Sequence, residues 1–180
     1  MRHYSGMEEP EFWKIIDESK QKLDRAARVK SIQNELAQLS PDEIADFHMK
    51  MLTIMHLADR LDLIAACSML IEEGSNDGFA SFRAWLISEG HDTFTRTLVD
   101  PDSLALIDFD RTLLFPEFLT VAEAPYSASA NSSIKEHRSV VECERRIANE
   151  VNSRGEEWNP LMDDQIRKLL PKMYRRWTGT

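Results

Sequence analysis

Glycine and cysteine are scarce in this chain, and each shortage excludes a class of protein. Six glycines in 180 residues are too few for a turn-rich all-β protein. The two cysteines, Cys67 and Cys143, have neither the number nor the spacing of a zinc site or a disulfide framework. Cys67 lies in an apolar run, where a buried and reduced thiol is expected. The sequence therefore disfavours β structure and predicts no metal ion and no cofactor.

Long apolar runs and excess positive charge are also missing. No segment approaches the roughly 20 apolar residues of a membrane-spanning helix, and the first ten residues lack the apolar core of a signal peptide. Lysines and arginines number 22 against 31 aspartates and glutamates, which gives a net charge of −9. Phosphate contacts need a clustered positive face. We therefore predict an acidic, cytoplasmic protein that binds neither membranes nor nucleic acid, although this charge does not exclude a basic partner.

Apolar residues at helical spacing are what the sequence does contain. The hydrophobic fraction of 42% and the charged fraction of 29% are ordinary for a globular protein, and the length suits one domain with a substantial core. We predict an all-α, single-domain irregular bundle of about seven helices over residues 10–180. Residues 1–9 are expected to be disordered, and the small polar run at residues 127–133 to be a mobile loop. The first apolar stripe, over residues 10–39, fits one long helix or two.

One helix start is especially clear in the local sequence. Ser40 is suited to cap a helix, Pro41 to occupy its first turn, and Glu43 to complete a capping box. The histidines of this helix, His48 and His56, lie two turns apart, which does not suit a shared metal ion, so solvated or capping roles are expected. The next helix, over residues 63–72, is apolar on nearly all sides and is predicted to be the most buried.

Residues 74–90 read as a turn, a helix with an aromatic face and a stop at Gly90. Phe79, Phe82 and Trp85 fall at helical spacing and are expected in the middle of the bundle. Arg83 lies between two of these rings, where an ion pair with Asp62 or Asp77 is the simplest role. The alternative is a clamp for an anion or carboxylate beside Trp85. Asp62, Asp77, Arg83 and Trp85 are therefore the candidate binding residues.

Several motifs in the first two thirds of the chain resemble those of one family. They are Glu11-Phe12-Trp13-Lys14-Ile15-Ile16, Leu39-Ser40-Pro41-Asp42-Glu43-Ile44, Ser75-Asn76-Asp77-Gly78-Phe79, Phe82-Arg83-Ala84-Trp85-Leu86-Ile87, Gly90 and Asp100-Pro101-Asp102-Ser103-Leu104. Together they are similar to a bacterial family catalogued only as a domain of unknown function, over residues 8–107. The resemblance implies a small helical domain. Because the family carries no known activity, no catalytic residue transfers from it.

An aliphatic run ending in Asp108-Phe109-Asp110-Arg111-Thr112 is similar to the nucleophile loop of haloacid-dehalogenase-type phosphatases. That resemblance implies that Asp108 attacks phosphorus, that Asp110 acts as acid and base, and that magnesium neutralises charge. Asp163-Asp164 would then be the later acidic pair. The context disagrees, because such a loop follows the first strand of a parallel sheet and no buried strands are evident here.

The last third of the chain has sparser apolar patterns. A charged helix over residues 134–152 is expected to be solvated or to lie against something outside this chain. A final helix over residues 163–177 contains Pro171 in its middle and gathers the chain's basic residues. Docking on the acidic body and binding a partner are both open for it.

Three functional hypotheses follow. The leading one is a non-enzymatic module that binds another protein, in a regulatory or toxin-neutralising setting. The second is a domain that binds a small molecule or anion through Asp77, Arg83 and Trp85. The third is a magnesium-dependent phosphatase that uses Asp108 and Asp110. The oligomeric state is left open by the sequence.

Overall fold

Helices make up every regular element in the part of the chain that the computed structural model describes, which is residues 6–22, 24–71, 75–107, 113–154 and 162–179. Within those ranges there are eleven α-helices, two 3₁₀-helices and no strand. The all-α fold class is therefore confirmed, and the prediction of about seven helices is wrong. No helix in these ranges is both long and apolar enough to cross a bilayer.

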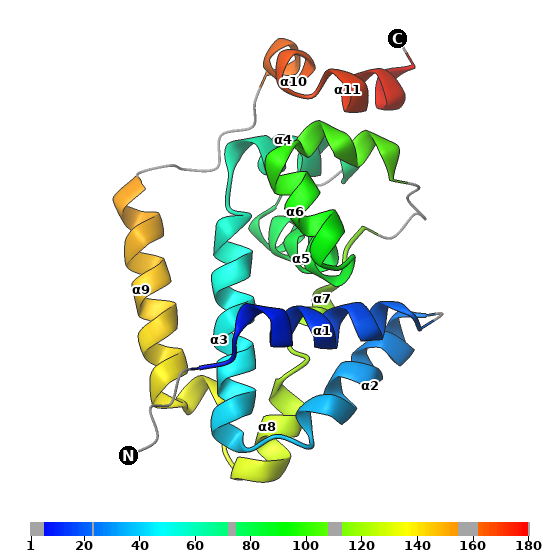
Figure 1. Cartoon of the computed structure of the whole chain (residues 1–180). Helices are drawn as coiled ribbons and strands as arrows, with labels where there is room; N and C mark the ends of the chain where they lie inside the picture. Colours follow the sequence, from blue (N-terminus) through cyan, green and yellow to red (C-terminus); the bar gives the residue numbers. More distant parts are fainter. Residues whose placement is uncertain (1–5, 23, 72–74, 108–112, 155–161, 180) are drawn as a thin grey trace.

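The helices surround α3, which lies between α9 on one side and α1, α2 and α8 on the other (Figure 1). Helices α4, α5 and α6 lie toward the upper end, below α10 and α11. In chain order the elements are α1 (Glu9–Lys20), α2 (Arg25–Leu36), α3 (Pro41–Leu57), α4 (Leu61–Leu70), α5 (Asn76–Ser88), α6 (His91–Val99), η1 (Pro101–Leu106), α7 (Pro116–Leu119), α8 (Glu123–Ala130), η2 (Ile134–Glu136), α9 (Arg138–Arg154), α10 (Asp163–Leu169) and α11 (Pro171–Thr178).

Local capping explains why the chain has more helices than its apolar stripes suggest. The first stripe forms two helices, because the Asp24 side chain caps α2 by accepting a hydrogen bond from the Ala27 amide at 2.8 Å. The capping box predicted at Ser40 and Glu43 is confirmed. Pro171 does not bend one C-terminal helix but begins a second, since proline has no amide to donate to the preceding turn.

The ends and loops of the chain also differ from the sequence-based expectation. The predicted loop at residues 127–133 is helical in its first half, because α8 continues to Ala130, and Asn131 ends it with a φ of 52°. Its mobility stays a prediction. At the N-terminus, α1 begins at Glu9, and most of the segment predicted to be disordered, residues 1–5, lies outside the described residues.

α5 is the central helix, and it packs against α1, α3, α4, α6 and α7. Phe79, Phe82 and Trp85 are each at most 5% exposed, which confirms their predicted place in the core. From Phe79 to Ser88 only Ala80 and Arg83 are not fully buried. The prediction that residues 63–72 form the most buried helix is wrong, because four of the ten α4 residues are buried, against eight of the thirteen in α5.

Cys67 on α4 is a free, buried thiol, as expected from its apolar surroundings. Burial raises the pKa of this thiol to about 12, an effect that the charge of Arg83 opposes. The thiol is therefore protonated at neutral pH, and a protonated thiol is a poor nucleophile. Cys67 acts as a small core residue.

α9 is attached to the rest of the molecule by a narrow strip. Only Val140 and Cys143 are buried, while Ile147 and Val151 are half-buried, and the other α9 side chains up to position 150 are exposed. This pattern of exposure agrees with the expectation of a sparsely apolar, largely solvated helix. Its partner is α3 of the same chain, which runs alongside it (Figure 1).

Two histidine–carboxylate contacts fasten this C-terminal segment to α3 at its two ends. His137 Nε2 lies 3.2 Å from Asp42 Oδ1 at the start of α3, and His56 Nε2 lies 3.1 Å from Glu150 Oε2 at the end of α3. Because residues about 95 positions apart are joined in each case, these contacts set the register of α9 along α3.

Of the two C-terminal helices, α11 docks on η1, in agreement with the intramolecular alternative. The buried carboxylate of Asp102 accepts hydrogen bonds from the amides of Lys172 and Met173 at 2.8–3.0 Å. Free amides at a helix start favour a carboxylate. Arg176 adds a hydrogen bond to the Ile107 carbonyl at 2.7 Å, and Leu170 and Met173 are buried.

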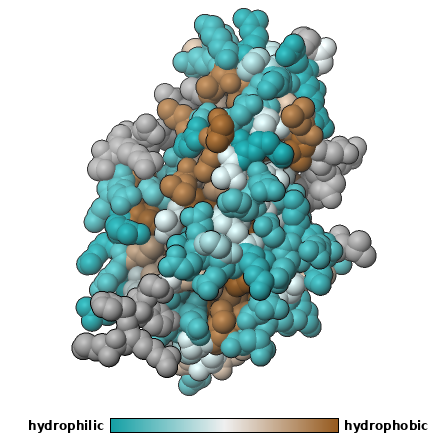
Figure 2. Space-filling model, viewed as in Figure 1, coloured by the Kyte–Doolittle hydropathy of each residue, from teal (hydrophilic) through white to brown (hydrophobic). Residues whose placement is uncertain are grey.

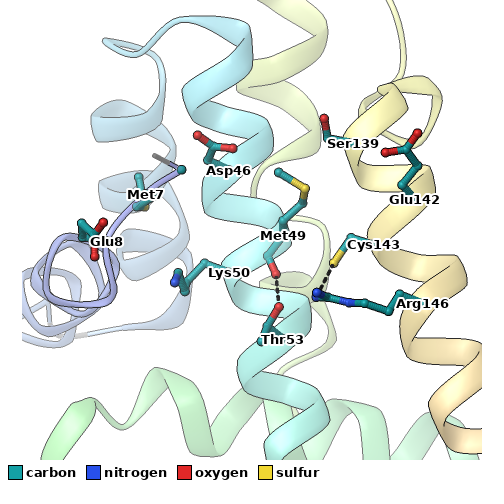
Figure 3. Close-up of a pocket in the computed structure, with 11 residues that line it drawn as sticks. Met7, Glu8, Asp46, Met49, Lys50, Thr53, Ser139, Glu142, Cys143 and Arg146 are labelled. Atoms are coloured by element: carbon teal, nitrogen blue, oxygen red, sulfur yellow. Dashed lines mark hydrogen bonds between the residues drawn. The ribbon is translucent and has the colours of Figure 1, made fainter. Parts of the chain in front are cut away.

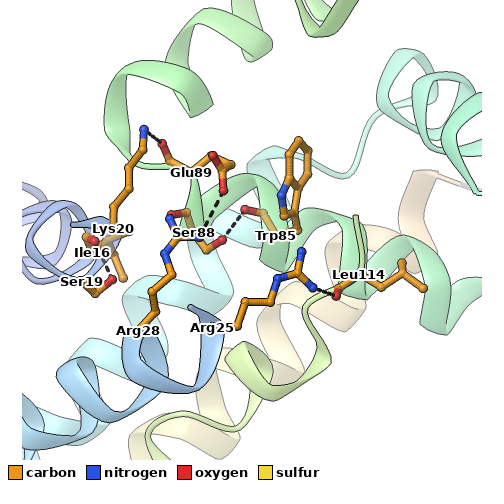
Figure 4. Close-up of polar contacts among 9 residues, drawn as sticks. All are labelled: Ile16, Ser19, Lys20, Arg25, Arg28, Trp85, Ser88, Glu89 and Leu114. Carbon is orange, nitrogen blue, oxygen red and sulfur yellow. Dashed lines mark hydrogen bonds and ion pairs between the residues drawn. The ribbon is translucent and has the colours of Figure 1, made fainter. Parts of the chain in front are cut away.

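Cations from α1 and α2 meet the C-terminal end of α5 (Figure 4). Lys20 Nζ donates to the Glu89 carbonyl at 2.6 Å, and Arg28 Nη2 donates to the Ser88 carbonyl at 2.8 Å. Arg28 Nη1 also lies 3.3 Å from the Glu89 carboxylate. The last carbonyls of a helix have no partner within it and carry partial negative charge. These contacts therefore join α1 and α2 to the central helix.

Replacing Arg28 with methionine should lower the free energy of unfolding by about 1–3 kcal/mol, because the Ser88 carbonyl on a buried residue loses its charged donor. The measurement is chemical denaturation followed by circular dichroism. Lys30→Met on the same helix is the matched control, since Lys30 is exposed. Equal losses of stability in the two variants would contradict this role for Arg28.

Candidate functional site

A groove of about 640 Å³ lies between α9 and the helices α3, α4 and α5. This volume is within the range of roughly 300–1,000 Å³ that is usual for ligand pockets. Figure 2 shows hydrophobic surface between α9 and the upper part of α3. The apolar lining residues are Leu52, Met55, Leu61, Ile64, Phe79, Ile147, Ala148 and Val151, and the polar ones are His56, Asp59, Asn76, Arg83 and Glu144. We call this site the Arg83 groove.

Arg83 is held in one position at this groove. Its guanidinium carbon lies 4.5 Å from the centre of the Phe79 ring, and Nη1 donates to the Met55 carbonyl at 3.2 Å. Nη1 is also 3.6 Å from Asp59 Oδ1. Burial lowers the pKa of the Arg83 guanidinium, and the charge of Asp59 opposes that shift. The side chain is thus a largely buried cation with one carboxylate neighbour among the described residues.

The structure brings only one of the four predicted binding residues, Arg83, to the groove. Asp62 instead accepts a hydrogen bond from Arg60 Nε at 3.1 Å, Asp77 is exposed in the first turn of α5, and Trp85 is buried in the core. The predicted ion pair of Arg83 with Asp62 or Asp77 is wrong, because Arg83 faces the C-terminal end of α3, where Asp59 follows the helix.

Most of the groove could not be predicted from the sequence. Asp59 and Leu61 follow the end of α3, and no local pattern links them to α5 or α9. The sequence shows Ile147 and Val151 as part of an apolar stripe, but it does not show which helices that stripe faces. The sequence therefore showed only the α9 side of the groove, and the facing residues come from helices 61 to 99 positions earlier in the chain.

A second hollow, of about 530 Å³, lies beside the first part of α9 and is lined by α3, α9 and the segment before α1 (Figure 3). Cys143 lies in it, and Arg146 Nη2 is 3.9 Å from its Sγ. The charged residues around it carry both signs and are Glu8, Asp46, Lys50, Glu142 and Arg146. This mixture favours no single class of ligand.

His48 is buried, contrary to the expectation of a solvated or capping histidine. His48 is 4% exposed, and its Nδ1 has no hydrogen-bond partner within the described residues. Burial lowers the pKa of His48, the charge of Glu123 opposes that shift, and the charge of Lys135 adds to it. Within the described residues, no group of three or more potential metal ligands is close enough to hold an ion. Asp108 and Asp110 lie outside these residues.

The lowered pKa of His48 makes stability depend on pH. In the unfolded chain the pKa of this histidine returns toward 6.5, so the unfolded state binds more protons below that pH. The free energy of unfolding should therefore fall as the pH drops from 7 to 5. In His48→Gln, which has no proton to bind there, the fall should be smaller, as measured by urea denaturation at each pH. Identical pH profiles for the two proteins would refute this assignment.

Comparison with known proteins gives a family but no characterised relative. No match was found among curated proteins or among solved structures. A family model described as "Protein of unknown function (DUF4240)" matches residues 7–128, which run from just before α1 into α8. This match confirms the resemblance seen in the sequence and extends it beyond residue 107, while α9, α10 and α11 lie outside it. The chain belongs to the DUF4240 family of proteins of unknown function.

Proposed function

We propose that this protein is a binding module that holds an apolar segment of a partner protein in the Arg83 groove. The observation that carries the proposal is the groove itself, whose apolar lining comes from four different helices. An apolar groove between helices is a usual receptor for the apolar face of a peptide or helix. The leading hypothesis from the sequence, a non-enzymatic protein-interaction module, thereby acquires a defined surface.

The structure of α9 supports this proposal in a second way. Its half-buried residues Ile147 and Val151 form one wall of the groove, and α3 and α4 form the facing walls. Because only Val140 and Cys143 of the described α9 side chains are buried, the helix can adjust between its two anchored ends at the cost of few buried contacts. We expect such a module to act in a regulatory or toxin-neutralising setting.

A small molecule is the second candidate occupant, favoured by the groove volume and by Arg83. Asp77 and Trp85, which the sequence placed in the same site, do not line the groove. This alternative therefore depends on Arg83 alone among the residues first named for it. Phosphatase activity through Asp108 and Asp110 stays a sequence-based prediction.

Replacing Leu61 with glutamine should weaken partner binding about tenfold, because an apolar contact worth roughly 1.5 kcal/mol is lost from the groove wall. Leu57→Gln is the matched control. Both leucines are exposed, at 41% and 53%, and lie four positions apart, but only Leu61 lines the groove. The wild-type protein and both variants are immobilised, and proteins captured from native cell extract are quantified by mass spectrometry.

The expected result is one stoichiometric partner that the wild type and Leu57→Gln retain and that Leu61→Gln largely loses. Either of two results would count against the proposal. One is that no protein is captured in stoichiometric amount, and the other is that the two leucine variants lose the partner equally.

A further inference from the structure

Arg83 has hydrogen-bonding capacity that the described part of the molecule does not use. Its contacts with the Met55 carbonyl and with Asp59 both involve Nη1, and its buried Nε donates to no described residue. A guanidinium carries five N–H donors in a fixed plane. The donors of Nη2, which is neither bonded to a described residue nor fully buried, therefore remain for a ligand in the groove, and a carboxylate is the group whose geometry matches the donors of this plane.

The charge of Arg83 is incompletely compensated by its surroundings. The side chain is 17% exposed, and its one ion-pair partner in the described residues, Asp59, is 27% exposed and 3.6 Å away. A buried charge that lacks a close partner is costly, and a carboxylate that approaches it gains attraction at the cost of its own desolvation. A carboxylate that reaches this groove thus gains a charge-assisted bond in a partly desolvated place.

Arg83 is also already positioned for such a bond. The Phe79 ring lies beneath the guanidinium, and the Met55 carbonyl fixes Nη1. Ordering a free arginine side chain on binding costs rotamer entropy, whereas a side chain held in advance avoids most of that cost. The groove therefore contains a preorganised donor next to an apolar surface.

The rest of the polar lining limits the number of negative charges that an occupant can carry. Asp59 and Glu144 line the same groove, and Glu150 lies at His56 on its edge. A second carboxylate on the occupant would face these groups and be repelled. One acidic group with apolar neighbours fits this arrangement.

We infer that the partner segment presents a single acidic side chain to Arg83, while its apolar neighbours contact Ile64 and Ile147. This inference rests on the proposed function, because it assumes that the groove receives an apolar segment. It adds that recognition depends on one carboxylate and that Arg83 is the residue that selects it.

The test uses sodium hexanoate, which carries one carboxylate on an apolar chain, and 1-hexanol as its neutral counterpart. Each is titrated into the ¹⁵N- and methyl-labelled full-length protein, and the Arg83 Nε–H signal and the methyl signals of Ile64 and Ile147 are followed by NMR. Hexanoate should shift all three and bind about tenfold more tightly than 1-hexanol. This preference should disappear in Arg83→Met and persist in Arg60→Met, since Arg60 does not line the groove.

The possible outcomes separate the inference from the proposed function. If both compounds shift the two methyl signals with equal affinity, the groove accepts apolar groups but the carboxylate inference is wrong. If neither compound shifts them, the groove does not accept apolar groups, and both the inference and the proposed function fail. Because the Arg83 Nε–H signal is read in the wild-type protein, the test does not depend on the variant folding.

Discussion

The burial of α5 from Phe79 to Ser88 is the constraint on which the rest of the structure depends. A helix that is buried on nearly all sides needs neighbours on every face, and α1, α3, α4, α6 and α7 supply them. Its C-terminal carbonyls also need donors, which Lys20 and Arg28 provide. Gly90 then turns the chain with a φ of +89°, and a side chain there would collide with the Asp17 carboxylate. The position of α1 and α2 therefore follows from how α5 ends.

The same constraint explains why a groove forms beside α9. Because α5 lies deep within the bundle, its one charged residue beyond the first turn, Arg83, is carried into a region that is mostly apolar. α9 follows α3 but buries only a narrow strip against it, so it leaves space over Arg83 instead of closing it. The family match ends within α8, so the family part supplies the α3, α4 and α5 walls, and the segment beyond it supplies the α9 wall.

Local physics made much of this fold predictable from the sequence, and long-range contacts made the site unpredictable. The cap at Ser40, the stop at Gly90 and the burial of Phe79, Phe82 and Trp85 follow from residues within a turn or two of each other. The neighbour of Arg83 does not: Asp62 or Asp77 was expected, and only the placement of α3 beside α5 makes Asp59 the carboxylate that Arg83 meets. Capping rules alone would predict that new helices begin after Asp24 and at Pro171. The apolar stripes continue through both positions, however, and so suggested uninterrupted helices. His48 shows the same limit, since its burial comes from packing that its own helix does not reveal.

Hydrogen exchange measured by mass spectrometry tests whether α5 is the fixed centre of the molecule and α9 its weakly attached wall. Exchange rates report the free energy of the opening that exposes each amide. We expect the amides from Phe79 to Ser88 to exchange only when the whole molecule unfolds, and those from Val140 to Val151 to exchange much faster through local opening. Protection in α9 as strong as that in α5, or rapid exchange in α5, would contradict this expectation.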